Sequence, residues 1–258
     1  LAGRADFHMH TKYCDGTASP EEMVQSAISK GLKVCGLSGH VYTPFDESYC
    51  MLQDDMNEYE KEIRALKEKY ADKIEILCGI EQDRFAGKPD REWDYVIGST
   101  HYVKCGDEYV PVDDTPETMV DAAKRYFDGD MYGLVEGYFE AAGDVCEATD
   151  ADVIGHFNQV CKFNRGGEGD KMGALFDEGH PRYVKAWKKA ADILLEYGIP
   201  FEINTGGISA GFRTDAYPSK TMRDYLKARG AKFIMSSDSH RIDTLCFGFG
   251  DERFRIWR

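Results

Sequence analysis

The residues of this sequence best suited to chemistry are histidines with carboxylates close to them. HMHTKYCDG, residues 8–16, places His8 and His10 one residue apart, with Asp15 five residues further on. SSDSH, residues 236–240, pairs Asp238 with His240. Imidazole and carboxylate groups bind Zn, Fe and Mn, and a carboxylate can bridge two ions. A single HxH is weak support for a metal site, so its weight depends on the elements that carry these residues.

Short apolar segments that read as β-strands alternate, for the most part, with longer segments of helical periodicity. The first helical segment begins with a capping box at Ser19 and Glu22 and carries Pro20 in its first turn. The predicted strands are 5–10, 32–38, 74–81, 94–100, 151–156, 200–205 and 231–240. The predicted helices are 19–31, 54–70, 116–128, 131–148, 181–198 and 218–230.

This alternation predicts an α/β fold with a parallel sheet and helices outside it. Seven strands favour a closed or nearly closed, TIM-barrel-like barrel, with a doubly wound open sheet as the alternative. No glycine-rich nucleotide-binding motif follows any predicted strand. The whole chain, residues 1–258, is predicted to be one domain, and residues 163–180 to be a long loop that is functional or mobile.

Six of the seven histidines lie at or just after the end of a predicted strand, and His180 is the exception. Active sites of α/β barrels lie at the C-terminal ends of the strands, so these side chains should converge with two carboxylates. The converging residues are His8, His10, His40, Glu81, His101, His156, Asp238 and His240. One zinc ion needs only three or four ligands, so we expect two or three ions, able to activate water and to clamp a phosphoryl or acyl oxygen.

Single residues of this set also have simpler explanations. Asp15 precedes Gly16 and suits a turn, Glu81 suits an ion pair, and Asp238 suits a helix cap. The concurrence at so many strand ends favours the metal site.

The composition limits the partners. A net charge of −14 disfavours long nucleic acids, whereas a small phosphorylated substrate is compatible with it because metal ions dominate the local potential. The sequence shows neither an apolar run long enough for a membrane span nor a signal peptide. Eight cysteines without a CxxC pair indicate buried thiols and a cytoplasmic protein. We expect a monomer or a small homo-oligomer.

The same residues resemble, in order, the motifs of the PHP (polymerase and histidinol phosphatase) family. These motifs are HMHTKYCDG, SGH with His40, GIE with Glu81, STHYV with His101, IGHF with His156, and SSDSH. PVDDTPETM, YFEAAGD and EINTGG followed by YPS look most like the monofunctional histidinol-phosphate phosphatases. The resemblance covers nearly the whole chain and implies a distorted (β/α)7 barrel, the PHP fold, with a trinuclear metal cluster.

The resemblance also implies a set of ligands for each divalent ion, whether Zn, Fe or Mn. One ion would be held by His8, His10, Glu81 and Asp238. Glu81 would bridge to a second ion, shared with His101 and His156. A third ion would be held by Asp15, His40 and His240. Some relatives use histidine in place of Asp15, and a hard oxygen ligand there could shift the metal preference.

One stretch departs from the family pattern. Related phosphatases tend to show GHFDLIRK, whereas this chain has GHFNQVCK, with Asn158 for aspartate and Cys161 for arginine. An arginine there would be a natural phosphate clamp. Lys162 or Arg165 could replace it, and Arg213 is a candidate second clamp or, equally, a solvated loop charge. The departure leaves the exact substrate open.

Together, the residues and the resemblance predict a phosphate monoester hydrolase. The resemblance favours a histidinol-phosphatase, which converts L-histidinol phosphate and water to L-histidinol and phosphate in histidine biosynthesis. A bridging hydroxide would attack phosphorus in line, with Glu81, Asp238 and His240 as the catalytic residues. The alternative is a PHP-type phosphoesterase acting on another small phosphate ester or a nucleotide.

Two other classes fit less well. An amidohydrolase-like hydrolase of C–N bonds shares the early HxH, but the fourth predicted strand ends in STHYV and offers no metal-bridging lysine. A non-catalytic metal-binding barrel is disfavoured because nearly every ligand position is retained.

Overall fold

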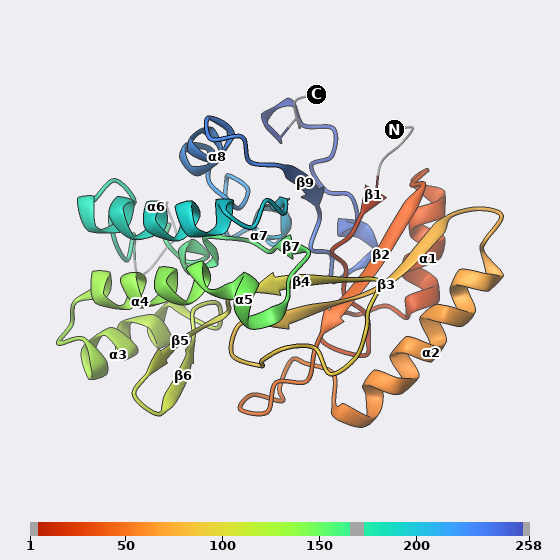
Figure 1. Cartoon of the computed structure of the whole chain (residues 1–258), viewed down its shortest axis with the longest axis horizontal. Coiled ribbons are helices and arrows are strands. Elements are labelled where there is room, and N and C mark those ends of the chain that lie inside the picture. The colour runs from red at the N-terminus through yellow and green to blue at the C-terminus, as the bar shows by residue number, and fades with distance from the viewer. Residues whose placement is uncertain (1–4, 166–172, 255–258) are drawn as a thin grey trace.

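The computed structural model of the chain describes residues 5–165 and 173–254. Its main feature is a seven-stranded sheet whose strands follow the order β1-β2-β3-β4-β7-β8-β9, with every pairing parallel (Figure 1). These strands are β1 (Ala5–Asp6), β2 (Val34–His40), β3 (Glu75–Asp83), β4 (Tyr95–Ser99), β7 (Val153–Ile154), β8 (Phe201–Asn204) and β9 (Phe233–Ser236). The predicted α/β class and parallel sheet are confirmed.

The two edges of the sheet meet, which makes a nearly closed barrel. Met9 and Ser239 form a parallel bridge just beyond β1 and β9. The His10 amide donates to the Ser239 carbonyl at 2.8 Å, and the Ser239 amide donates to the His8 carbonyl at 3.2 Å. The two histidine-containing segments at opposite ends of the sequence are therefore neighbours in the barrel wall.

Most of the helices cover the outside of the barrel on two flanks. The helices are α1 (Pro20–Ser29), α2 (Gln53–Lys69), α3 (Pro116–Tyr126), α4 (Met131–Gly143), α5 (Val145–Thr149), α6 (Pro181–Leu195), α7 (Gly206–Ser209) and α8 (Lys220–Lys227). Figure 1 shows α1 and α2 on one flank and α3, α4 and α6 on the other. The predicted capping box is present at α1, where the Glu22 amide donates to Ser19 Oγ at 3.3 Å and the Ser19 amide donates to Glu22 Oε2 at 2.8 Å.

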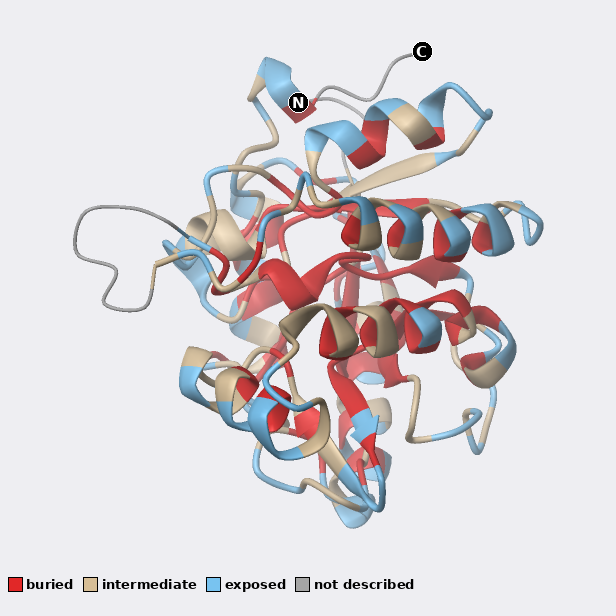
Figure 2. Cartoon of the chain, turned by 90° about the vertical axis from the view of Figure 1, so that its left-hand side faces the viewer, coloured by how far each residue is buried: buried red, intermediate tan, exposed pale blue. Residues whose placement is uncertain are grey.

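Each flank has its own hydrophobic core, because the inward face of each helix carries the apolar side chains. One core lies between α1, α2 and strands β2 and β3, and includes Met23, Tyr59 and Ile76. The other lies between α4, α6 and the β7–β8 side, and includes Tyr138 and Trp187. Figure 2 shows the buried residues on the sheet and on the inner faces of the helices. The two cores hold the strand ends in fixed positions.

Several predicted boundaries were wrong, each for a local reason. The last strand ends at Ser236 rather than at residue 240, because Asp238 has a left-handed backbone with φ of 50°. The predicted helix 131–148 is broken at Asp144, which caps both α4 and α5. A hairpin of β5 (Tyr102–Cys105) and β6 (Glu108–Pro111) was not predicted, although two short apolar runs flank its turn.

The glycine-rich stretch 163–180 was predicted to be a loop. Residues 163–165 and 173–180 contain no helix or strand, and residues 166–172 lie outside the described part of the chain. All eight cysteines are described and are free thiols, six of them buried. Among the described residues, no helix has both the length and the apolar character needed to cross a membrane.

Candidate metal centre

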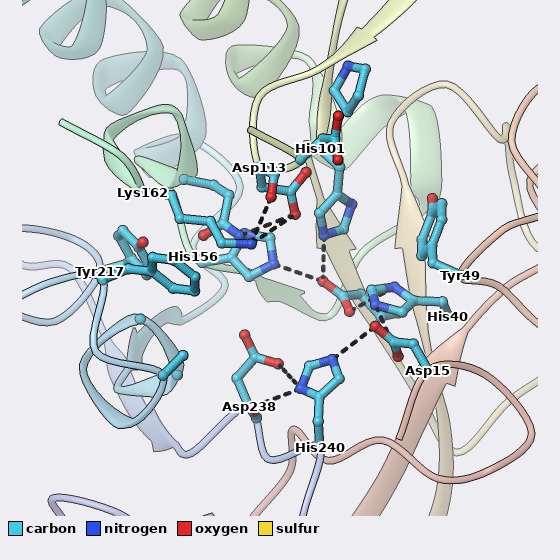
Figure 3. Close-up of a pocket in the computed structure, with 18 of the residues that line it drawn as sticks. Asp15, His40, Tyr49, His101, Asp113, His156, Lys162, Tyr217, Asp238 and His240 are labelled. Carbon is cyan, nitrogen blue, oxygen red and sulfur yellow. Dashed lines mark hydrogen bonds and ion pairs between the residues drawn. The ribbon is translucent and has the colours of Figure 1, made fainter. Parts of the chain in front are cut away.

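The candidate site is a cavity of about 650 Å³ at the C-terminal ends of the barrel strands (Figure 3). Most of the predicted ligands line it, namely Asp15, His40, Glu81, His101, His156, Asp238 and His240. His8 and His10 are fully buried and contact Glu81 and Asp238 from the interior of the barrel. The structure thus brings all nine predicted ligands into one contiguous group.

Glu81 lies at the centre of this group. Its Oε1 is 2.8 Å from His156 Nε2 and 3.3 Å from His101 Nε2. Its Oε2 is 3.0 Å from His8 Nε2 and 3.1 Å from His40 Nδ1. Burial by itself would raise the pKa of this carboxyl, but the imidazoles of His8, His40 and His101 hold it well below its usual range. Glu81 is therefore an ionised carboxylate shared by histidine side chains from four separate segments.

Two further carboxylates lie beside the imidazoles. Asp238 Oδ1 is 3.2 Å from His10 Nε2 and 3.6 Å from His8 Nε2. Asp15 Oδ2 is 3.1 Å from His240 Nε2, and Asp15 Oδ1 is 3.8 Å from His40 Nε2. Burial opposes ionisation of both acids, yet the neighbouring histidines lower the pKa of each carboxyl. All three acids are thus negatively charged, as metal ligands must be.

The donor atoms of this group suit divalent ions. His10 Nε2 is fully buried and has no hydrogen-bond partner of acceptable geometry, although carboxylate oxygens of Asp238 and Glu81 lie 3.2 and 3.4 Å away. Carboxylate oxygens cannot donate a hydrogen bond to this nitrogen. A cation bound by both the nitrogen and the oxygens would satisfy all of these atoms. Donor atoms within 4.8 Å of one another form three sets, namely His10/Asp15/His40/His240, His8/His10/Glu81 and His40/Glu81/His101.

These sets overlap the ligand groups implied by the family resemblance without matching them one to one. His10 lies with Asp15 and His240 as well as with His8, and its ring stacks on His240 at a centroid distance of 4.0 Å. His40 lies with Glu81 and His101 as well as with Asp15. The distribution of the ligands among ions therefore stays a prediction.

Three buried acids that support the cluster were missed in the sequence. Glu202 Oε1 lies 2.6 Å from His8 Nδ1, and Asp83 Oδ2 lies 3.2 Å from His101 Nδ1. Asp6 accepts from the Ser237 amide at 3.1 Å, and burial raises its pKa to about 6. The signal was present, because each acid stands in an apolar strand. Asp6 and Asp83 also lie two residues from a predicted ligand, on the same strand face.

The predicted phosphate-binding residues occupy three different surroundings. Lys162 lines the cavity, where its Nζ donates to the Asp113 carbonyl at 2.7 Å (Figure 3). Arg165 is exposed, outside the cavity lining, and donates to the Gly211 carbonyl at 2.6 Å. Arg241, which the sequence reasoning missed, lines the rim and pairs with Asp243 at 2.6 Å.

Arg213 also lies outside the cavity lining. Its Nη1 donates to the carbonyls of Cys161 and Asn164 at 2.9 and 3.0 Å and to Glu178 Oε1 at 3.0 Å. Cys161 itself is buried in the hydrophobic core, with its Sγ 3.1 Å from the Tyr183 hydroxyl. In this arrangement Arg213 ties the 161–164 turn to Glu178, and the Cys161 thiol does not line the cavity.

Comparison with known proteins identifies the family of the chain. The profile of the PHP domain matches residues 6–206, most of the chain and nearly all of the cluster. The chain belongs to the PHP family. This PHP protein is 28% identical over 267 residues to a Deinococcus radiodurans protein named "Probable histidinol-phosphatase", an alignment covering 97% of this chain and 92% of the relative. A Schizosaccharomyces pombe protein of the same name is 28% identical over 249 residues, which covers 85% and 74% of the two chains.

Solved structures share the fold of the PHP protein. A Listeria monocytogenes protein described as a candidate histidinol phosphatase superposes with a TM-score of 0.78 at 19% identity, covering 96% of this chain and all of that one. Histidinol phosphate phosphatase from Lactococcus lactis, solved with zinc, L-histidinol and phosphate, superposes with a TM-score of 0.64 at 22% identity, over 93% and 87% of the chains. The distorted (β/α)7 barrel expected for the family is confirmed. The PHP protein is a metal-dependent phosphoesterase with buried His, Glu and Asp clusters for metal ions.

Proposed function

We propose that this PHP protein hydrolyses phosphate monoesters and that its substrate is L-histidinol phosphate. The observation that carries the reaction class is the position of Glu81, a buried carboxylate within 3.3 Å of imidazole nitrogens from His8, His40, His101 and His156 at the base of an open cavity. The names of the two relatives at 28% identity support the substrate.

We propose two or three divalent ions for the site, with Zn, Fe and Mn as the candidates. When bound, they supply a hydroxide nucleophile at neutral pH and stabilise negative charge on the phosphoryl group. The nine ligand residues proposed to hold them are those of the cluster, His8, His10, Asp15, His40, Glu81, His101, His156, Asp238 and His240. Among these, Glu81, Asp238 and His240 are the proposed catalytic residues, because they bring charged groups to the cavity surface.

The remaining cavity wall supports a cationic leaving group. Histidinol carries an ammonium and an imidazole, and Asp46, Asp113 and Asp114 line the cavity. Gln159 also lines it, and its buried Oε1 accepts no hydrogen bond from the described part of the chain. Lys162 adds a positive charge to the cavity wall beside Asp113, which can attract the phosphate of the substrate. The three aspartates and the Gln159 oxygen complement cationic histidinol better than they complement the anionic part of a nucleotide.

The direct test is phosphate release by protein loaded with Zn, Mn or Fe. We expect turnover of L-histidinol phosphate to exceed that of other monoesters, including nucleoside bisphosphates. Turnover of another ester without turnover of histidinol phosphate would contradict the substrate and keep the reaction class. Absence of any phosphatase activity in the metal-loaded protein would contradict the function.

A pair of substitutions in one strand tests the role of the cluster. Glu81→Gln removes the charge at the centre of the group, so we expect metal content to fall and activity to drop by several orders of magnitude. Glu75→Gln is the matched control, because Glu75 begins the same strand β3 but is exposed. A Glu81 variant that stays active without bound metal would contradict metal-dependent catalysis.

A further inference from the structure

The hydroxyl of Tyr217 is a buried donor at the cavity that the function above does not use. Tyr217 lines the cavity and is only 2% exposed. Its ring lies 6.5 Å from the ring of His156, edge to face, on the side of the cavity away from Tyr49 (Figure 3). The hydroxyl oxygen has no hydrogen-bond partner in the described part of the chain. A buried hydroxyl left without a partner costs free energy, so its partner is expected to arrive with a ligand.

The backbone around Tyr217 holds this ring rigidly. The Asn204 amide donates to the Tyr217 carbonyl at 2.7 Å, and the Tyr217 amide donates to the Asn204 carbonyl at 2.9 Å. This bridge fixes the residue to the end of strand β8, two residues after Glu202. Gly207 makes room for the ring, since a Cβ at this position would lie 2.7 Å from the Tyr217 hydroxyl. The side chain is thus placed by the barrel itself.

The phenol acts as a neutral donor. Burial raises the pKa of Tyr217 well above its usual value, and the nearby charge of Arg213 offsets this only in part. Arg213, which the sequence suggested as a phosphate clamp, is therefore close to Tyr217 but outside the cavity lining. Of these two side chains, only Tyr217 belongs to the cavity lining.

The other two tyrosine hydroxyls of the cavity lining already have partners. The Tyr102 hydroxyl donates to Asp46 Oδ2 at 2.9 Å, and the Tyr49 hydroxyl lies 3.1 Å from Thr43 Oγ1. Lys162 Nζ donates to the Asp113 carbonyl, and the acids of the cluster can only accept. A phosphate ester brings three non-bridging oxygens, all acceptors, into this acceptor-rich cavity.

We propose that the Tyr217 hydroxyl donates a hydrogen bond to a non-bridging oxygen of the phosphoryl group. The inference rests on the proposed function, because it needs a phosphoryl ligand in the cavity. Charge grows on these oxygens in the transition state, so a fixed neutral donor stabilises that state without reorganising. Tyr217 is then a catalytic residue outside the metal-ligand motifs.

The test compares Tyr217→Phe with wild type and with Tyr183→Phe, all loaded with the same metal. Tyr183 is equally buried, but its hydroxyl contacts a thiol in the core outside the cavity. For Tyr217→Phe we expect kcat/KM to fall about 100-fold, as for loss of one oxyanion donor. The dissociation constant of inorganic phosphate, measured by calorimetry, should rise about 10-fold. Metal content and melting temperature should not fall, because the hydroxyl has no hydrogen-bond partner among the residues that the structure describes.

The outcomes separate this inference from the function. Unchanged phosphate affinity in Tyr217→Phe, with an active wild type, overturns the inference and leaves the function intact. The inference is also overturned if Tyr217→Phe lowers kcat/KM for alkyl phosphates but not for p-nitrophenyl phosphate. Because only the alkyl leaving group needs a proton, that result would mean that the hydroxyl acts on the leaving group. The wild type could bind phosphate but hydrolyse no monoester, while Tyr217→Phe binds phosphate more weakly. That result would contradict the proposed function and support the hydrogen bond from Tyr217 to the phosphoryl group. A wild type that neither hydrolyses esters nor binds phosphate overturns both.

Discussion

Glu202 Oε1 lies 2.6 Å from His8 Nδ1, while the other nitrogen of the same ring lies 3.0 Å from Glu81 Oε2. His8 is thus held between a carboxylate behind it and the cluster in front of it. Glu202 is fully buried, and its second oxygen accepts from the His156 amide at 2.9 Å. One acid from strand β8 therefore orients two predicted ligands, a support that metal-binding histidines commonly require.

The first prediction concerns Glu202→Gln. The substitution keeps the shape of the side chain but removes its charge. It also places an NH2 group, which donates, opposite the His8 ring or the His156 amide, which donate as well. The His8 ring therefore loses its fixed orientation. We expect metal affinity and activity to fall about 10- to 100-fold, measured by metal titration and phosphate release. Glu196→Gln, at the exposed end of α6, is the control. Wild-type metal affinity in Glu202→Gln would show that the cluster does not depend on this support.

The second prediction uses two adjacent glycines as probes of two neighbours. A Cβ at Gly206 would lie 2.9 Å from Asp238 Cβ and Oδ2, and a Cβ at Gly207 would lie 2.7 Å from the Tyr217 hydroxyl. We expect Gly206→Ala to displace Asp238 and reduce the metal content. Gly207→Ala should retain the metal and weaken phosphate binding. Each variant is the control for the other. Equal loss of metal in both would contradict the assignment of Gly206 to the metal site and of Gly207 to the phosphate site.

The third prediction concerns the pH dependence of metal binding. Burial alone would lower the pKa of His240, but its hydrogen bond to Asp15 and the nearby negative charges raise the pKa from 6.5 to about 9. A divalent ion binds the neutral imidazole, so at neutral pH it must displace this proton. Metal affinity should therefore increase as the pH rises from 6.5 towards 9.

Calorimetric metal titrations in buffers of different ionisation enthalpy would count the released protons. His240→Asn should release fewer protons than wild type at neutral pH. His180→Asn should behave as wild type, because His180 caps α6 outside the cluster. Metal affinity that does not change over this pH range would contradict the assigned role of His240.

The fourth prediction separates two roles of Arg213. Its guanidinium bonds two main-chain carbonyls and Glu178, with only 12% of its side chain exposed. We expect Arg213→Met to lower the free energy of unfolding by about 3 kcal/mol, because buried acceptors lose their donor. Chemical denaturation measures this loss. A variant with wild-type stability but a large rise in KM would instead support the phosphate clamp suggested by the sequence.

Much of the centre could be predicted from the sequence for one physical reason. Parallel strands separated by helices all end at the same edge of a barrel, so residues at strand ends meet however far apart they lie in the chain. His8, Glu81 and His156 illustrate this. His8 and His156 follow β1 and β7, and each has a ring nitrogen within 3.0 Å of a carboxylate oxygen of Glu81 in β3. Strand periodicity therefore predicted eight of the nine residues of the cluster, and the family resemblance added Asp15.

The sequence determined the class of fold, the edge where the predicted ligands gather and, through the order of its motifs, the family. Only the tertiary structure decided which groups stand behind the predicted ligands and which face the cavity. Glu202 contacts His8 across 194 residues, and Arg213 faces the 161–164 turn while Tyr217 lines the cavity. A periodic pattern assigns a residue to a strand end or a loop. The direction of a loop side chain is set by long-range packing and hydrogen bonds, which no local pattern records.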